Sequence, residues 1–91
     1  MSENVKRYYA LYDKVAKLYD NAFPCVNDLV AVRLGKEQCA KIYANDKHLA
    51  NDLEVHYLYS LDISTGKITE NAPSLVFSFH DFIETDLKEQ K

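Results

Sequence analysis

The sequence has 91 residues, enough for one domain and too few for two, and 47% of them are apolar. This composition excludes a disordered chain, and no apolar run reaches seven residues, which argues against a signal peptide or a membrane span. The net charge of −3 is uneven: residues 1–50 carry eight Lys and Arg against six acids, and residues 51–91 carry three Lys against eight acids. Only the first half therefore has the positive charge that favours binding to a polyanion. We expect one domain over residues 1–91, with an ordered core at about 5–80 and an acidic tail or short helix at 81–91, in a protein that is cytoplasmic and not exported.

The first segment, "KRYYALYDKVAKLYD" from Lys6 to Asp20, fits two periodicities. As a helix, its apolar residues recur at i, i+3, i+4 and i+7 and form one seam. As a strand over Val5–Asp13, it alternates between two faces. Periodicity alone leaves the choice open. The side chains that would share one strand face are Lys6, Tyr8, Ala10, Tyr12 and Lys14.

The clearest helix begins in "NDLVAVRLGKEQCAKIYA", residues 27–44. Asn27 is a good N-cap and Asp28 places a negative charge in the first turn, where the helix dipole favours it. The apolar residues form one stripe, which predicts that the helix packs on a sheet. Gly35 costs about 1 kcal/mol relative to Ala inside a helix, so it indicates either close packing at that turn or simple tolerance.

Residues 53–71, "LEVHYLYSLDISTGKITEN", predict a β-hairpin with its turn at Asp62–Gly66, because an acidic turn entry is followed by a glycine suited to positive φ. Alternating apolar residues over Leu75–Phe79 predict a further strand, followed by a charged tail or a short helix over 83–91. The positions expected on one face of the first hairpin strand are Val55, Tyr57, Tyr59 and Leu61.

No residue pattern indicates catalysis, because the sequence lacks a Gly-rich phosphate loop, a nucleophile elbow and an H-E-x-x-H motif. Cys25 and Cys39 form no C-x-x-C pair, and the three histidines stand at no metal-ligand spacing from them. We therefore expect two free thiols, no metal, no cofactor and no enzymatic activity.

The strongest pattern combines cations with aromatic rings. Nucleic-acid binding without base readout needs side chains that neutralise phosphates and flat rings on which bases stack. Two interpretations stay open for the tyrosines: they contact bases, or they are half-buried sheet residues whose hydroxyl groups reach water. The residues that we predict to contact nucleic acid are Lys6, Arg7, Tyr8, Tyr12, Lys14, Lys17, Arg33 and Lys36.

The order of five short motifs resembles the small nonstructural protein of gokushovirus-type microviruses, which are phages with single-stranded DNA genomes. The resemblance covers about residues 7–70, and each motif alone is short. In chain order the motifs are "YALYD" (Tyr9 to Asp13), "FP" (Phe23, Pro24), "NDLVAVR" (Asn27 to Arg33), His48 with Asp52, and "DISTG" (Asp62 to Gly66).

This resemblance implies an α+β fold, a small β-α-β-β unit with one main helix on an antiparallel or mixed sheet. It favours a strand that ends near Asp13, followed by a loop, and leaves Leu75–Phe79 as an extra strand at an edge. The tyrosine face then looks either at solvent or at the underside of the helix that starts at Asn27.

The resemblance also implies a DNA-associated role, since such proteins are regarded as counterparts of the C protein of the isometric coliphages. The expected partners are viral DNA, single-stranded or replicative form, and viral replication or procapsid proteins, with a role in the switch from replication to genome packaging. The alternative is an acidic adaptor that binds a viral or host protein without contacting DNA, because most dedicated nucleic-acid binders are basic. The small size of the chain and an unpaired strand at the edge of its sheet also point to a homodimer.

Overall fold

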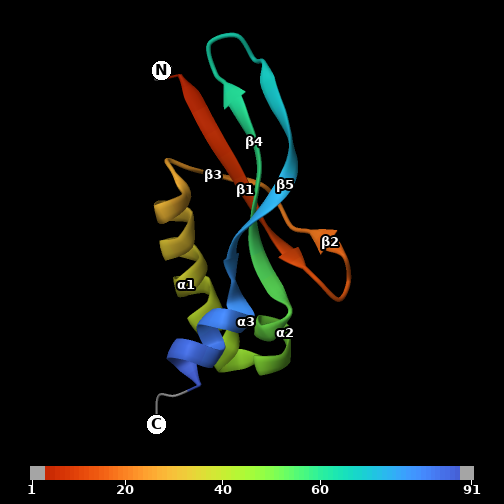
Figure 1. Ribbon diagram of the computed structural model, residues 1–91, viewed down its shortest axis with the longest axis vertical. Coiled ribbons are helices and arrows are strands. Elements are labelled where there is room, and N and C mark those ends of the chain that lie inside the picture. Colours follow the sequence, from red (N-terminus) through yellow and green to blue (C-terminus); the bar gives the residue numbers. More distant parts are fainter. Residues whose placement is uncertain (1–3, 89–91) are drawn as a thin grey trace.

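The computed structural model describes residues 4–88, apart from the side chains of residues 70–72. It confirms an α+β fold in which one long helix lies on an antiparallel sheet (Figure 1). The strands are β1 (Val5–Asp13), β2 (Leu18–Tyr19), β3 (Phe23–Cys25), β4 (Leu53–Asp62) and β5 (Ile68–Ser78). The helices are α1 (Asp28–Asn45), α2 (Lys47–Asn51), α3 (Phe79–Phe82) and the π-helical turn η1 (Ile83–Leu87). The sheet order is β2-β1-β4-β5, and β3 pairs with β1 on the same edge as β2.

The first segment is a strand, so the helical interpretation of its periodicity is wrong. β1 pairs with β4 along its whole length, from Val5 opposite Asp62 to Asp13 opposite Leu53. The strand ends at Asp13, whose carboxylate accepts hydrogen bonds from the backbone N–H groups of Val15 and Ala16 and so closes a turn. Tertiary pairing on both edges of β1 therefore overrides the helical seam.

Helix α1 begins where the sequence predicts, since the Asn27 side chain accepts a hydrogen bond from the Val30 N–H at 3.0 Å. Gly35 is buried where α1 crosses the sheet. A Cβ atom at this position would lie 2.8 Å from Phe77 Cδ2 and 3.1 Å from Val55 Cγ2. Close packing is therefore the reason for the glycine.

The predicted hairpin is present, with Gly66 at φ 79° in its turn and Asp62 accepting hydrogen bonds from Ser64. The expected return strand and the expected extra strand over Leu75–Phe79 are wrong as separate elements, because both belong to β5. Two register shifts against β4 absorb the irregular middle of β5 without ending the strand, and Phe79 already starts α3.

One of these irregularities also changes the faces of β4. Tyr8 lies opposite Tyr59 and Tyr9 lies opposite Tyr57, so Leu58 is an extra residue in β4, a β-bulge. Because Tyr8 and Tyr9 point to opposite faces, Tyr57 and Tyr59 do so as well. The prediction that Val55, Tyr57, Tyr59 and Leu61 share one face is therefore wrong.

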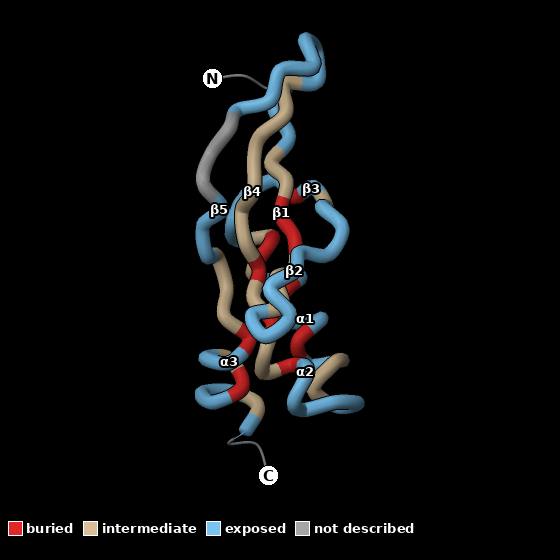
Figure 2. Tube along the Cα trace, turned by 90° about the vertical axis from the view of Figure 1, so that its right-hand side faces the viewer, coloured by how far each residue is buried: buried red, intermediate tan, exposed pale blue. Residues whose placement is uncertain are grey.

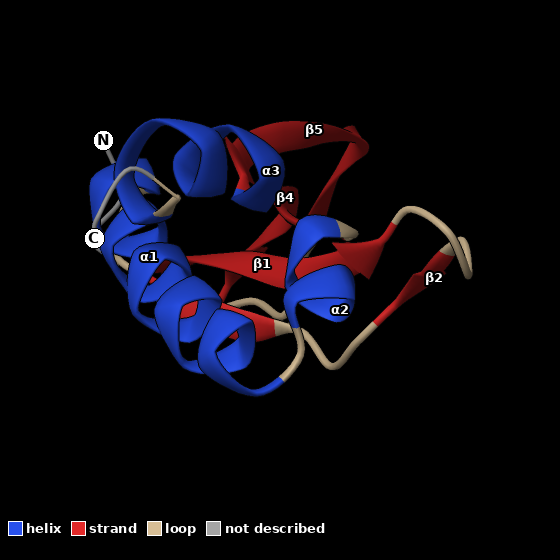
Figure 3. Cartoon of the chain, turned by 90° about the horizontal axis from the view of Figure 1, so that it is seen from below, coloured by secondary structure: helices blue, strands red, loops and turns tan. Residues whose placement is uncertain are grey.

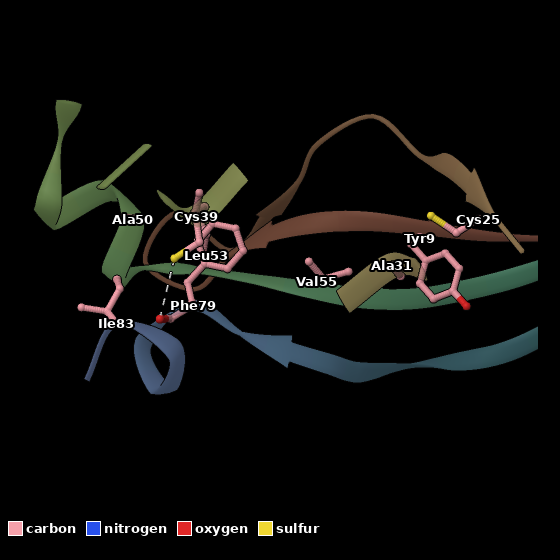
Figure 4. Packing of buried hydrophobic residues seen from close by; sticks show 9 residues of the cluster. All are labelled: Tyr9, Cys25, Ala31, Cys39, Ala50, Leu53, Val55, Phe79 and Ile83. Atoms are coloured by element: carbon pink, nitrogen blue, oxygen red, sulfur yellow. Dashed lines mark hydrogen bonds between the residues drawn. The ribbon is translucent and has the colours of Figure 1, made fainter. Parts of the chain in front are cut away.

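The core lies between the helices and one face of the sheet (Figures 2 and 4). Both cysteines are free and buried, and burial raises the pKa of Cys39 to about 11. The segment expected as an acidic tail or short helix is helical through α3 and η1, and Ile83 belongs to the core; residues 89–91 lie outside the described residues. The largest side chains that are fully buried are Tyr9, Phe79, Val55 and Cys39.

Candidate nucleic-acid interface

The two faces of β1 have different surroundings. Tyr9 points toward α1, as its hydroxyl contact with Asp28 shows. The alternate residues of β1 point the other way, and we call the sheet face opposite α1 the open face. Figure 3 shows α1 at the left of the view and β2 at the right, beyond the end of β1. The residues of β1 on the open face are Lys6, Tyr8, Ala10 and Tyr12.

Rings from three strands gather on the open face, and we call this set the aromatic strip. Tyr8 and Tyr59 are stacked, with ring centroids 5.1 Å apart and planes 13° apart. The ring of Tyr12 lies 4.6 Å from that of Tyr19 and 4.9 Å from that of His56. Such pairs contribute about 0.5–1.5 kcal/mol each beyond their buried area, so the rings hold one another in place. The aromatic strip consists of Tyr8, Tyr12, Tyr19, His56 and Tyr59.

Hydrogen bonds fix the orientation of His56. Its Nε2 lies 2.8 Å from Glu54 Oε1, and its Nδ1 lies 3.0 Å from the hydroxyl oxygen of Tyr19. An ionised carboxylate only accepts, so Nε2 carries a proton, and in the neutral ring Nδ1 accepts from the Tyr19 hydroxyl. Burial, followed by the nearby Tyr12 and Glu54, raises the pKa of Tyr19. The short strand β2 is thereby anchored to β4 across β1.

Lysines stand near both ends of β1. Lys6 is exposed on the open face, opposite Leu61. The sequence predicts Lys14 on the same strand face. However, β1 ends at Asp13, and Lys14 and Lys17 both lie in the turn that leads to β2. Lys17 adopts φ 61° in this turn, and both lysines are exposed.

Arg7 lies on the α1 side of the sheet and is already engaged. Its Nε donates to the Tyr9 hydroxyl at 2.8 Å, its Nη2 donates to Asp28 Oδ1 at 3.0 Å, and its Cζ lies 4.2 Å from the ring centroid of Tyr57. The Tyr9 hydroxyl itself donates to Asp28 at 2.6 Å. Burial raises the pKa of Tyr9 to about 12, and the bonds from Tyr9 and Arg7 lower the pKa of Asp28. Arg7 thus joins β1 to the start of α1.

Arg33 and Lys36, the last two cations predicted to contact nucleic acid, lie on α1, away from the open face. Arg33 is exposed and has no ion pair with any residue in the described part of the chain. The Nζ atom of Lys36 lies 5.7 Å from the ring centroid of Phe82. The structure therefore brings Lys6, Tyr8 and Tyr12 together and separates Arg33 and Lys36 from them.

Three members of the aromatic strip, Tyr19, His56 and Tyr59, were not among the sequence-predicted site residues. Tyr59 was expected on the same face as Tyr57, and only the bulge moves it to the open face. His56 joins the strip because it lies opposite Ala10 in the register between β1 and β4. Tyr19, 43% exposed, lies opposite Tyr12 in a strand of two residues that local sequence signals cannot reveal.

Over 4–88, no three His, Cys, Asp or Glu side chains gather in a way that would hold a metal ion. Over the same residues, no helix combines the length and the apolar character needed to cross a bilayer. The aromatic strip is thus the most distinctive assembly of functional groups on this part of the chain.

The fold and the strip define a small α+β protein that carries an aromatic surface on one sheet face. The chain belongs to the family described as Phage ORF5 protein, whose sequence pattern matches residues 6–82. It is therefore a small phage protein, and the matched segment contains every residue of the aromatic strip as well as Lys6. Comparisons with curated proteins and with solved structures return no match.

Proposed function

We propose that this phage protein binds viral DNA through the open face of its sheet. The observation that carries the proposal is the aromatic strip, which places Tyr8 and Tyr12 beside Lys6 on the sheet face opposite α1. Base stacking on such rings contributes about 1–3 kcal/mol per base, and lysines at both ends of β1 supply contacts to phosphates. The function is binding, not catalysis.

The biological role that we propose follows the sequence resemblance to the gokushovirus-type nonstructural protein, the counterpart of the C protein of isometric coliphages. The protein would act in the cytoplasm of the host bacterium, where it would bind viral DNA or the replication complex. It would then help to switch replication toward packaging of the genome into the procapsid. Viral replication and procapsid proteins are the partners that this role requires.

A mobility-shift titration at two salt concentrations tests DNA contact, with single-stranded and duplex probes. We expect binding that weakens with salt, because each phosphate contact releases counterions. Lys6→Gln should weaken binding and reduce the salt dependence, whereas Lys41→Gln, an exposed position on α1, should change neither. Tyr12→Leu should weaken binding, with Tyr43→Leu on α1 as its matched control. No shift at low salt with either probe would overturn the proposal.

The alternative function, a protein-binding adaptor, is supported by a different surface. Two adjoining hollows of 290 and 360 Å³ lie between α1 and the connection from β1 to β3, and both are lined by Leu11 and Asp20. Nearby, Leu18 is 67% exposed and Leu34 is 37% exposed. The net charge of −3 fits this role better than DNA binding. The apolar residues that line the two hollows include Leu11, Phe23, Leu34, Val55, Leu18, Ile42, Leu49 and Leu53.

Purified viral replication and procapsid proteins distinguish the two functions. If the adaptor function is correct, Leu34→Glu and Leu18→Glu should abolish binding to one of these proteins, while Tyr12→Leu should not. If DNA binding is the function, the same two Glu variants should retain the mobility shift. Circular dichroism of each variant establishes that it is folded.

A further inference from the structure

We infer that the aromatic strip selects single-stranded DNA over duplex DNA and that it holds bases at two stations along β1. The first station is the Tyr8–Tyr59 pair, and the second is the cluster of Tyr12, Tyr19 and His56. This inference rests on the proposed DNA-binding function and names the form of DNA that the same face accepts.

The small number of cations beside the strip argues against duplex as the ligand. Duplex affinity comes largely from phosphate contacts, of which strongly bound proteins make about six to ten. Of the cations predicted to contact nucleic acid, Lys6 lies on the open face and Lys14 and Lys17 lie in the turn after β1, whereas Arg7 is bonded to Asp28, and Arg33 and Lys36 lie on α1. With the net charge of −3, phosphate contacts alone are too few to hold a duplex.

The rings of the aromatic strip add base stacking to the few phosphate contacts, but only unpaired bases can stack on them. Bases inside a duplex are already stacked on their neighbours, whereas bases of a single strand can turn out and stack on aromatic side chains. The rings of the strip are ordered by contacts with one another, and His56 is also held by Glu54 and Tyr19. They therefore lose little side-chain entropy when a base binds.

The spacing of the two stations sets the length of strand that is needed. Tyr8 and Tyr12 are four residues apart on β1, which corresponds to about 13 Å along a strand. Successive bases of a stacked strand are about 3.4 Å apart, so both stations are reached by a segment of about five nucleotides. Between the stations lies Ala10, which is fully buried and offers no ring of its own.

Binding of oligothymidylates of increasing length tests both parts of the inference. The chain has seven tyrosines, four of them in the strip, and no tryptophan, so quenching of its tyrosine fluorescence follows base stacking on the strip, and labelled oligonucleotides give a second readout by anisotropy. We expect affinity to rise at least tenfold between two and about six nucleotides and then to level off, because the second station is then filled. A duplex hairpin of the same length should bind at least tenfold more weakly.

Single substitutions at the stations provide the sharper readout. Tyr8→Leu should lower the affinity for long oligonucleotides by about tenfold. It should also abolish the gain beyond the shortest lengths, because one station is left. Tyr12→Leu, which removes a ring of the second station, should have the same two effects. Tyr43→Leu should leave both affinity and length dependence unchanged. With about three lysines in contact, the slope of log affinity against log salt should be near −2.

The possible failures are distinct. If the duplex binds as tightly as the single strand, or if affinity does not depend on length in the wild-type protein, the inference is wrong while the proposed DNA binding stands. If neither form binds at low salt, the proposed function is wrong, and the inference falls with it.

Discussion

Tyr8 and Tyr9 are neighbours in the chain, but the two faces of the sheet give them opposite roles. Tyr9 is fully buried beneath the start of α1, and its hydroxyl donates to Asp28. Tyr8 stacks on Tyr59 on the open face, where its ring contributes to a surface. The comparison teaches that one face of β1 stabilises the fold, while the other can serve binding at little cost to stability.

The largest expected difference between the two faces is in stability. Tyr9→Ala should lower the free energy of unfolding by about 3–5 kcal/mol, because it leaves a cavity in the core and removes a partner of both Arg7 and Asp28. Tyr8→Ala should cost about 1 kcal/mol, the value of a cross-strand pair. Urea unfolding followed by circular dichroism measures both. Equal losses in the two variants would show that the open face also belongs to the core.

The packing between α1 and the sheet face that it covers can be tested with Gly35→Ala. Helix propensity alone would stabilise α1 by about 1 kcal/mol. The new Cβ would, however, lie 2.8 Å from Phe77 Cδ2, and overpacking costs about 1–3 kcal/mol, so we expect a net loss of about 1 kcal/mol. Ala40→Gly, at an exposed position of α1, isolates the propensity term and should cost about 1 kcal/mol. A Gly35→Ala protein that unfolds at higher urea concentration than wild type would contradict close packing here.

The contacts of Asp28 with Tyr9 and Arg7, on the sheet face that α1 covers, should make the stability of the protein depend on pH. Hydrogen bonds from Tyr9 and Arg7 lower the pKa of Asp28 in the folded protein, so its stabilising effect is complete above about pH 4 and is lost as pH falls through the folded pKa. Asp28→Asn should therefore lower the Tm at pH 7, by the equivalent of about 1 kcal/mol. The gap between variant and wild type should close toward pH 2, where both side chains are neutral. A gap that is constant from pH 7 to the acid end would rule out this account.

The smallest expected effect tests the open face. Tyr19→Phe removes the hydrogen bond to His56 Nδ1 and keeps the ring, so it should cost less than about 1 kcal/mol of stability. DNA affinity should stay within about twofold, because stacking depends on the ring. Urea unfolding and fluorescence titration measure the two quantities. Loss of DNA binding in this variant would mean that the hydroxyl, rather than the ring, makes the contact.

Local signals in the sequence predict the parts of this fold that depend on nearest neighbours. Asn27 marks the start of α1 because an N-cap needs only the residues that follow it. Gly66 marks the hairpin turn because positive φ is a property of one residue. The alternation of β1 likewise places Lys6, Tyr8 and Tyr12 on one face.

The remaining features depend on pairing between distant segments, which one sequence does not display. The sequence predicts that Arg7 contacts phosphate, and it gives no sign that Asp28, 21 residues away in the chain, accepts a hydrogen bond from Arg7. The irregular register of β5 joins two segments that appear separate in the sequence. His56 becomes part of the strip because it lies opposite Ala10.

The bulge at Leu58 makes the aromatic strip depend on the register of β4 as well as on the kind of its residues. Without the bulge, that is with Leu58 paired in register, β4 would keep one uninterrupted alternation, and Tyr59 and Leu61 would turn toward the same side as Val55. Tyr8 would then lose its stacking partner although no tyrosine had changed. Deletion of Leu58, in contrast, makes Tyr57 and Tyr59 direct neighbours that still point to opposite faces, so the aromatic strip should survive this deletion.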